Sequence, residues 1–278
     1  MKEDKKTSIL SSSNTVQDPW QSLRKFTSAR IALGRVGSSL PTKEILNFGM
    51  AHAMARDAVH LSLDVDLLES QIQSIGFATI KVHSRAHDRA SYLLRPDWGR
   101  RLDDESTLRL EEAAKDSIDL LLVVADGLSS LAVQKHAVPM LNAITELLPT
   151  SWKIGPLVIA SQARVALADD IGERMKARMT ILLIGERPGL SSPDSLGLYL
   201  TYKPKLACSD ANRNCISNVR PEGLSYQAAA KKLIWLAQES VRLKLSGVAL
   251  KDESDVQQIV KDELGMLNKA NRTKTVQY

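Results

Sequence analysis

A short apolar run at 181–184 ends abruptly in a charged turn, Gly-Glu-Arg-Pro-Gly at 185–189. Such a run is typical of a buried strand, and glycine and proline directly after it predict a turn. The carboxylate of Glu186 is therefore expected at the end of a strand. Two polar segments follow at 191–197 and 212–218, and we interpret the second as a loop because it is too polar for a core strand. Polar loops at strand ends commonly hold ligands.

Two other apolar runs end in the same way. The run 120–125 is followed by Asp-Gly-Leu-Ser-Ser, and the run 157–160 by Ser-Gln-Ala-Arg-Val. If these strands are parallel, their carboxyl ends meet at one edge of the sheet, where open α/β sheets bind ligands. A purely structural role is the alternative, in which Asp126 and Ser129 cap the next helix and Gly185 and Gly189 only turn the chain. The convergence of the segments favours a binding site for a large polar ligand.

The order of the apolar runs indicates the fold. Buried strands are predicted at 120–125, 157–160, 180–184 and 198–202, with a short strand at 78–82. Helical spacing connects them over 130–148, which includes Pro139, from 165 to about 178, and over 225–245. Apolar strands without polar alternation need helices on both faces. We therefore predict an α/β fold, a Rossmann-like parallel sheet with helices on both faces, preceded by an N-terminal helical segment.

The chain before this sheet is expected to be mainly helical. Helices are predicted over 41–60, with Pro41 at the start, and over 66–75 and 103–114. The polar N-terminus cannot bury enough apolar surface to order itself and is predicted to be a mobile arm. The expected division is an arm at 1–18, a mainly helical region at 19–115, a Rossmann-like domain at 116–250 and a charged C-terminal tail at 251–278.

Composition narrows the function classes. The 278 residues carry a net charge of +5, but the 37 Lys and Arg are scattered among 32 acidic residues, so a nucleic-acid adaptor is only a weak alternative. No apolar run approaches the roughly 20 residues of a membrane span, and the N-terminus lacks the apolar core of a secretory signal. Cys208 and Cys215 fit a reducing compartment and match no zinc pattern. We expect a cytoplasmic protein without a membrane partner.

A nucleotide-binding Rossmann oxidoreductase is the main alternative on the fold alone. Its site needs G-x-G-x-x-G after the first strand, so that backbone amides reach a pyrophosphate. None of the predicted strand ends carries this pattern, and Gly-Arg-Val-Gly at 34–37 is only a partial match that precedes the sheet. The P-loop pattern is also absent. His83 and His87 are four residues apart, but a strand end does not align two imidazoles as a helix does, so no metal site is predicted there.

Four segments carry a specific resemblance to a known family. They read TSARIALGRVGSSLPTKEIL at 27–46, AHAMARDAVH at 51–60, IGERPGLSSPDSLGLYLTY at 184–202 and RNCISNVRPEGLSY at 213–226. With these motifs in this order, the chain resembles the light (small) subunit of ethanolamine ammonia-lyase from about Arg24 to about Leu250.

The resemblance implies an adenosylcobalamin-dependent enzyme that converts ethanolamine to acetaldehyde and ammonia. A heavy subunit would bind ethanolamine and carry the radical chemistry, while this chain would bind the nucleotide side of cobalamin and contribute no catalytic residue. Carried over motif by motif, the cofactor contacts are Val165, Glu186 and Cys215. From the residues alone, Glu186 could instead pair with Arg187 or Arg164, Val165 could be a core residue, and Cys215 a small buried hydrophobe.

The way in which the cofactor is held can also be predicted. The Asp-x-His-x-x-Gly signature of corrinoid proteins whose own histidine replaces the cofactor base is absent, so base-on cobalamin is expected. The cobalt would arrive inside the cofactor. Residues 27–39 interleave arginines with apolar residues, and we interpret them as a partner-facing surface. Subunit stoichiometry and packaging inside a bacterial microcompartment stay open.

Overall fold

The structure, a computed structural model, describes residues 15–206 and 208–255. Most of the predicted arm at 1–18 and of the predicted tail at 251–278 lies outside these described residues. The described chain forms two compact units, residues 15–56 with 189–192, and residues 57–188 with those from 193 onward.

The first unit contains the 3-10 helix η1 (Gln21–Phe26) and most of the long helix α1 (Thr42–His60). α1 begins directly after Pro41, whose carbonyl accepts the N–H groups of Glu44 and Ile45. The helix predicted at 41–60 is confirmed. Large apolar side chains of α1 are exposed, namely Ile45, Leu46, Phe48, Met50 and Met54. Within the first unit, apolar surface of this helix is therefore uncovered.

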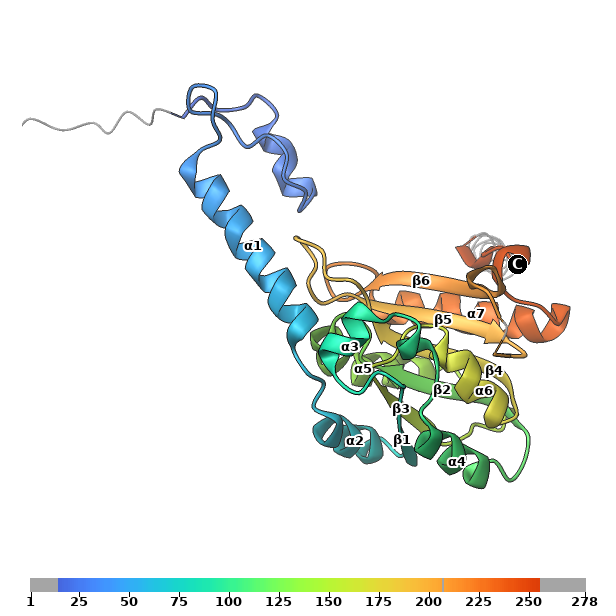
Figure 1. The fold of residues 1–278 in the computed structure, drawn as a ribbon. Coiled ribbons are helices and arrows are strands. Elements are labelled where there is room, and N and C mark those ends of the chain that lie inside the picture. Colours follow the sequence, from blue (N-terminus) through green and yellow to red (C-terminus); the bar gives the residue numbers. More distant parts are fainter. Residues whose placement is uncertain (1–14, 207, 256–278) are drawn as a thin grey trace, which may run out of the picture. The chain divides into compact units, whose positions relative to one another are not determined.

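The second unit is built on a sheet that has six strands within the described residues, in the order β1-β3-β2-β4-β5-β6 (Figure 1). Four strands, β1, β3, β2 and β4, run parallel, whereas β5 is antiparallel to β4 and β6 is antiparallel to β5. The fold is therefore α/β with a mixed, mostly parallel sheet. The strands are β1 (Thr79–His83), β2 (Ile118–Ala125), β3 (Leu157–Ser161), β4 (Ala177–Gly185), β5 (Leu196–Tyr202) and β6 (Arg213–Val219).

Alternate residues of β2 enter two separate cores, because successive side chains of a strand point to opposite faces. Leu120 and Leu122 pack into the core covered by α2 (Val65–Ser74), α5 (Ser130–Thr145) and α7 (Tyr226–Leu243). Leu121 and Val123 pack into the core covered by α4 (Asp104–Ala113) and α6 (Leu167–Arg174). Helices therefore cover both faces of the sheet, as predicted.

Polar side chains start most of these helices. Asp64, Asp88, Asp103, Ser129 and Ser225 each accept a backbone N–H group of the first turn. α3 (Arg89–Leu94) was not predicted, because six residues are too few to show a helical period. Its local signal is the reciprocal pair of hydrogen bonds between Asp88 and Ser91. None of the helices in the described chain combines the length and hydropathy that a membrane span needs.

Three details of the predicted elements are wrong. The run at 198–202 is β5, which runs antiparallel to β4, since an apolar run carries no information on strand direction. The segment 212–218 is not a loop but nearly all of the edge strand β6, in which Ile216 and Val219 are buried while Cys215 and Ser217 are exposed. Its polarity comes from its open face. The helix after Val165 ends at Arg174, because β4 begins at Ala177.

Candidate functional site

A cleft opens where β2, β3 and β4 end, around a cavity of about 370 Å³. Its walls include Gly127 after β2, Arg164 and Val165 after β3, Glu186 after β4, and Tyr199 of β5. The three polar segments that follow these strands therefore meet at one cavity, as predicted. The carboxyl edge of a parallel sheet is the usual place for a ligand in such folds.

Asp126 organises two of these segments. Its buried carboxylate accepts the N–H groups of Gly127 at 2.8 Å, Gln162 at 2.8 Å and Ala163 at 2.9 Å. Arg89 of α3 lies 3.6 Å from the same carboxylate. Burial raises the pKa of Asp126, and the amide donors and Arg89 oppose this shift. Asp126 thus ties the loop after β3 to the end of β2 rather than capping α5.

The turns after β2 and β4 touch at two glycines. A Cβ on Gly127, whose φ is +60°, would lie 2.2 Å from the carbonyl oxygen of Gly185. A Cβ on Gly185 would lie 2.0 Å from the carbonyl oxygen of Ser129. Without these side chains the turns approach closely enough for the Leu128 N–H to donate to the Gly185 carbonyl at 3.0 Å. Both positions therefore require glycine.

Glu186 leaves the end of β4 and reaches past β5 toward β6. Its N–H donates to the Ser195 carbonyl at 3.0 Å, and its Oε2 accepts the N–H of Asn218 at 3.1 Å. The side chain passes over Gly197, where a Cβ would lie 3.1 Å from Oε1. Within the described residues Glu186 forms no ion pair, so the alternative of a surface pair with an arginine is not observed there. Its Oε1 is available to a hydrogen-bond donor on a ligand.

Cys215 lies directly opposite Tyr199 in the antiparallel register of β5 and β6. The two side chains share one face of the sheet, and the thiol interacts with the phenol hydroxyl. Although the residue as a whole is exposed, desolvation of the sulfur raises the pKa of Cys215, and the hydroxyl partly offsets this shift. Burial and the neighbouring thiol likewise raise the pKa of Tyr199. Both groups are therefore neutral at pH 7.

The structure brings two of the three predicted site residues to one cavity and places the third next to a residue that lines it. Val165 and Glu186 line one cavity, and Cys215 adjoins it through Tyr199. Val165 is half-buried and also packs against the core under α6, so its side chain contacts both core and cleft. Sequence reasoning missed Tyr199, whose signal is an aromatic residue in the otherwise aliphatic run 196–200.

Two arginines from separate segments enclose Tyr92 of α3. The guanidinium carbons of Arg89 and Arg164 lie 4.6 Å and 4.2 Å from the centroid of its ring. Tyr92 is fully buried and donates its hydroxyl to the Ala163 carbonyl at 3.1 Å. Each arginine keeps one buried nitrogen, Nη2 of Arg89 and Nε of Arg164, without a hydrogen-bond partner in the described chain. Because such donors are costly to leave unpaired, they fit a polar ligand in this region.

The structural alternative is confirmed for Ser129. Its hydroxyl accepts the N–H of Ala132 as the cap of α5 and donates to the Pro193 carbonyl at 2.8 Å. The neighbouring Asp194 pairs with Lys135 of α5 at 2.8 Å. These contacts hold the segment just before β5 against α5, and so determine where the chain enters β5 after the turn that follows β4.

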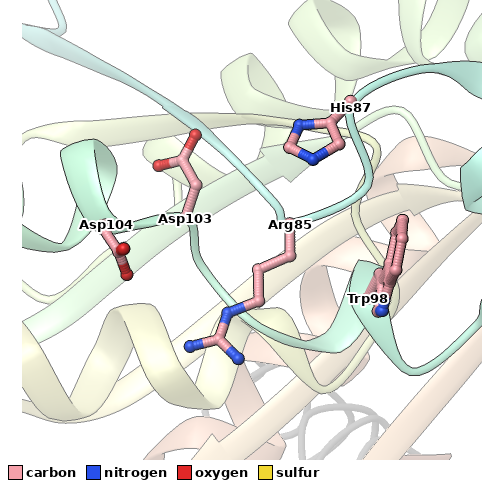
Figure 2. A pocket seen from close by; sticks show the side chains of 5 residues that line it. All are labelled: Arg85, His87, Trp98, Asp103 and Asp104. Atoms are coloured by element: carbon pink, nitrogen blue, oxygen red, sulfur yellow. The ribbon is translucent and has the colours of Figure 1, made fainter.

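Another cavity, of about 340 Å³, is lined by segments before and after α3 and by the start of α4, and contains none of the predicted site residues (Figure 2). Figure 2 shows Arg85 with the two aspartates, Asp103 and Asp104, on one side and the pair formed by His87 and Trp98 on the other. The His87 and Trp98 rings meet edge to face with centroids 6.1 Å apart. Asp103 caps α4, and Arg85 donates to a backbone carbonyl at 3.3 Å. Arg85 and Asp103 thus already serve the fold.

In the part of the chain that the structure describes, no group of three or more His, Cys, Asp or Glu side chains is placed to hold a metal ion. His83 directs Nδ1 to the carbonyl oxygen of Ser84 at 2.7 Å. His87, four residues later, faces Trp98 in the cavity of Figure 2. The two histidines therefore serve different parts of the structure.

The mostly parallel sheet, with a polar cleft at the carboxyl edge of its strands, places this chain among the α/β proteins. The family model described as ethanolamine ammonia-lyase light chain (EutC) matches residues 17–251. The ethanolamine ammonia-lyase small subunit of Ralstonia nicotianae is 54% identical over 244 residues, which cover 86% of this chain and 90% of that protein. The small subunit of Azotobacter vinelandii is 54% identical over 248 residues, which cover 88% of this chain and 92% of that protein. The small subunit of Pseudomonas paraeruginosa is 54% identical over 252 residues, which cover 89% of this chain and 92% of that protein.

The chain therefore belongs to the family of ethanolamine ammonia-lyase light chains and is a subunit of this carbon–nitrogen lyase. This confirms the resemblance carried by the four sequence segments. It also decides against the nucleotide-dependent oxidoreductase and the nucleic-acid adaptor. A small subunit implies a heavy subunit as its partner.

Proposed function

We propose that this chain binds the nucleotide side of base-on adenosylcobalamin, the cofactor of ethanolamine ammonia-lyase, in the cleft at the carboxyl edge of its sheet. The observation that carries the proposal is that Val165 and Glu186 line one cavity, with Cys215 beside it. Buried arginine nitrogens without partners in the described chain add support, because a polar ligand would supply acceptors for them. In this proposal the sheet acts as a Rossmann-like support whose strand ends present the ligand-binding turns.

Each residue has a distinct part in the proposed binding. Oε1 of Glu186 accepts a hydrogen bond from an amide or hydroxyl of the cofactor, while Oε2 stays on the Asn218 N–H. Val165 and the Tyr199 ring offer apolar contact. Cys215 packs as a neutral thiol against Tyr199 and keeps that ring turned toward the cleft. None of these residues acts as a catalytic acid or base.

The reaction itself is assigned to the heavy subunit, which would bind ethanolamine. When bound, adenosylcobalamin supplies the radical chemistry that removes ammonia and leaves acetaldehyde. The exposed apolar side chains of α1 support a contact with a protein partner, since large apolar surface is rarely left in water. The predicted region at 19–115 also supplies β1, α2 and α4 to the sheet unit, so in this proposal cobalamin binds to that unit as a whole and not to residues 116–250 alone. A cytoplasmic location fits this role.

Co-purification with the heavy subunit tests the proposal. The two subunits are co-expressed, incubated with cobalamin and passed over a size-exclusion column monitored in the visible corrinoid band. We expect the complex to elute with stoichiometric corrinoid and the isolated light chain to show no lyase activity. A complex that elutes without visible absorbance after incubation would contradict the proposal.

A further inference from the structure

We propose that a cavity at the amino edge of the sheet binds a phosphate monoester, the anion of a small phosphorylated molecule. This amino-edge cavity, of about 440 Å³, lies where β2 and β4 begin and β5 ends, beside the last turn of α6. It shares no lining residue with the cleft, which opens after the other ends of β2 and β4. The eight residues of β2 span about 23 Å between the two. The ligand is therefore separate from the cofactor.

The lining of the amino-edge cavity has an excess of positive charge. Four basic side chains line it, namely Lys176, Arg178, Lys203 and Lys205, against two acidic ones, Asp119 and Glu173, which leaves an excess of two charges. Both acids already bind protein donors. Asp119 pairs with Arg178 at 3.1 Å and accepts the Lys153 N–H at 2.8 Å, and Glu173 accepts the Leu206 N–H at 2.8 Å. An anion is therefore the ligand that this lining favours.

Three of the four basic side chains have capacity left for a ligand. Lys176 does not, because its Nζ donates to the Ala114 carbonyl at 3.2 Å. Lys203 and Lys205 are exposed and form no ion pair with any residue that the structure describes. Arg178 keeps a buried Nε without a hydrogen-bond partner among the same residues. A bound anion would supply an acceptor for this donor and a counter-charge for both lysines.

The backbone holds Lys203 at the cavity in a strained conformation. Its φ is +49°, in the left-handed region that glycine adopts at lower cost. Its N–H donates to the Arg178 carbonyl at 2.8 Å, and Pro204 follows it. Pro204 packs so closely on α6 that a Cβ on Gly172 would lie 2.5 Å from its Cγ. Strain that the surrounding packing maintains in this way is typical of binding sites.

A phosphate monoester matches the charge and the size of the amino-edge cavity. It carries a charge of about −1.5 to −2 at pH 7 and three acceptor oxygens, against the two excess positive charges and the three available side chains. A carboxylate carries only one charge. The volume is within the range of small-molecule sites, and Ile118, Ala177 and Pro204 add apolar surface to the lining. The site therefore suits a phosphate that carries a small organic group.

Phenyl phosphate is the probe that tests this assignment. It is titrated into the complex with the heavy subunit, and binding is followed by calorimetry, with benzoate and benzyl alcohol as the singly charged and neutral analogues. We expect saturable binding of phenyl phosphate and much weaker binding of both analogues. Lys205→Gln should lower the affinity for phenyl phosphate by about fivefold, because one charged contact is lost.

Two substitutions of Lys203 separate binding from folding. Lys203→Gly should lower the affinity by about fivefold while the melting temperature stays the same or rises, because glycine relieves the left-handed strain. Lys203→Arg, which keeps the charge, should retain binding. Lys231→Gln, at an exposed lysine of α7 outside the cavity, is the matched control and should leave the affinity unchanged.

Three results would overturn the assignment. Equal affinity for benzoate and phenyl phosphate would show that the site does not select a phosphate. Unchanged affinity in Lys203→Gly and Lys205→Gln would show that the anion binds elsewhere. Loss of phenyl phosphate binding when the complex is saturated with hydroxocobalamin would place the anion in the cleft.

Discussion

Tyr199 and Cys215 face each other across β5 and β6, and their contact joins the edge strand of the sheet to the cleft. The pairing of β5 with β6 becomes irregular between Leu196 and Leu198. Near the same end, Asn218 adopts a left-handed conformation with φ of +58° and donates its N–H to Glu186. A register shift at the edge of a sheet changes the direction in which nearby side chains and amides point. β6 therefore positions two residues of the cleft, Glu186 through the Asn218 N–H and Tyr199 through its pairing with Cys215.

Replacing Glu186 with alanine is expected to reduce cofactor affinity far more than stability. The variant loses the acceptor that faces the cleft, which should weaken cobalamin binding by about tenfold or more. It loses only one hydrogen bond within the described protein, to the Asn218 N–H, so the free energy of unfolding should fall by about 1 kcal/mol. Titration in the visible band and thermal melting measure the two effects. Glu112→Ala, at an exposed position of α4, is the control. A large loss of melting temperature with unchanged affinity would reverse this assignment.

Gly185 and Gly189 flank the same charged turn but should respond differently to alanine. At Gly185 the added Cβ meets backbone carbonyl oxygens of Ser129 and Asp126, at 2.0 Å and 2.6 Å. At Gly189, whose φ is not positive, its nearest neighbour is the Ser192 hydroxyl at 3.0 Å, a side chain that can rotate away. Gly185→Ala is therefore expected to destabilise the protein by at least about 1–3 kcal/mol, and Gly189→Ala by much less. Equal urea midpoints for the two variants would show that the contact at Gly185 can relax.

Asp126→Asn should disrupt the loop after β3. The amide can accept hydrogen bonds with only one of its two terminal atoms, so at least one of the buried donors from Gly127, Gln162 and Ala163 loses its acceptor, and Arg89 loses its counter-charge. Breaking a buried charge pair in this way costs about 3–5 kcal/mol. Urea unfolding measures this loss. Asp116→Asn, in an exposed pair with Lys153, should leave the urea midpoint nearly unchanged. A stable Asp126→Asn variant would contradict this role of the charged carboxylate.

The alkylation of Cys215 should depend steeply on pH. Because its pKa is raised, the thiol is protonated at neutral pH, and the reactive thiolate appears only as pH rises above the ordinary thiol range. Iodoacetamide labelling, followed at the peptide level by mass spectrometry, should be slow at pH 7.5 and accelerate above about pH 9. Tyr199→Phe removes the hydroxyl that lowers this pKa, so the curve should move to still higher pH. Fast labelling at pH 7 would contradict the assignment of a neutral, packed thiol.

The first four strands of the sheet could be predicted from the sequence because they are buried apolar runs between helical segments. The direction of β5 could not be read from the apolar run itself, since Leu196–Tyr202 is equally apolar in either direction. The available signal was the connection at 186–195, which contains no helix and is too short for the crossover that parallel neighbours need. β6 was missed because one of its faces is open, which makes the strand look like a polar loop. Its buried positions, Arg213, Ile216 and Val219, do not keep a strict period of two.

The site was predictable in part, from two kinds of signal. Val165 and Glu186 follow apolar runs, and the topology of a parallel sheet brings such ends together. Cys215 was inferred from the family resemblance alone, because its position depends on the pairing of β6 with β5. Arg164 and Tyr92 could not be paired from sequence, since they are 72 residues apart and meet only through tertiary packing.

Hydrogen exchange of the complex with the heavy subunit, measured with and without cobalamin, tests the central claim most directly. Backbone amides at 161–166, 185–188 and 213–218 should exchange more slowly when cobalamin is bound, because the first two segments line the cleft and the third lies beside it, paired with β5. The amides of α4, which contributes no residue to the cleft, should not change. Slower exchange confined to segments outside the cleft, with these three unaffected, would contradict the account.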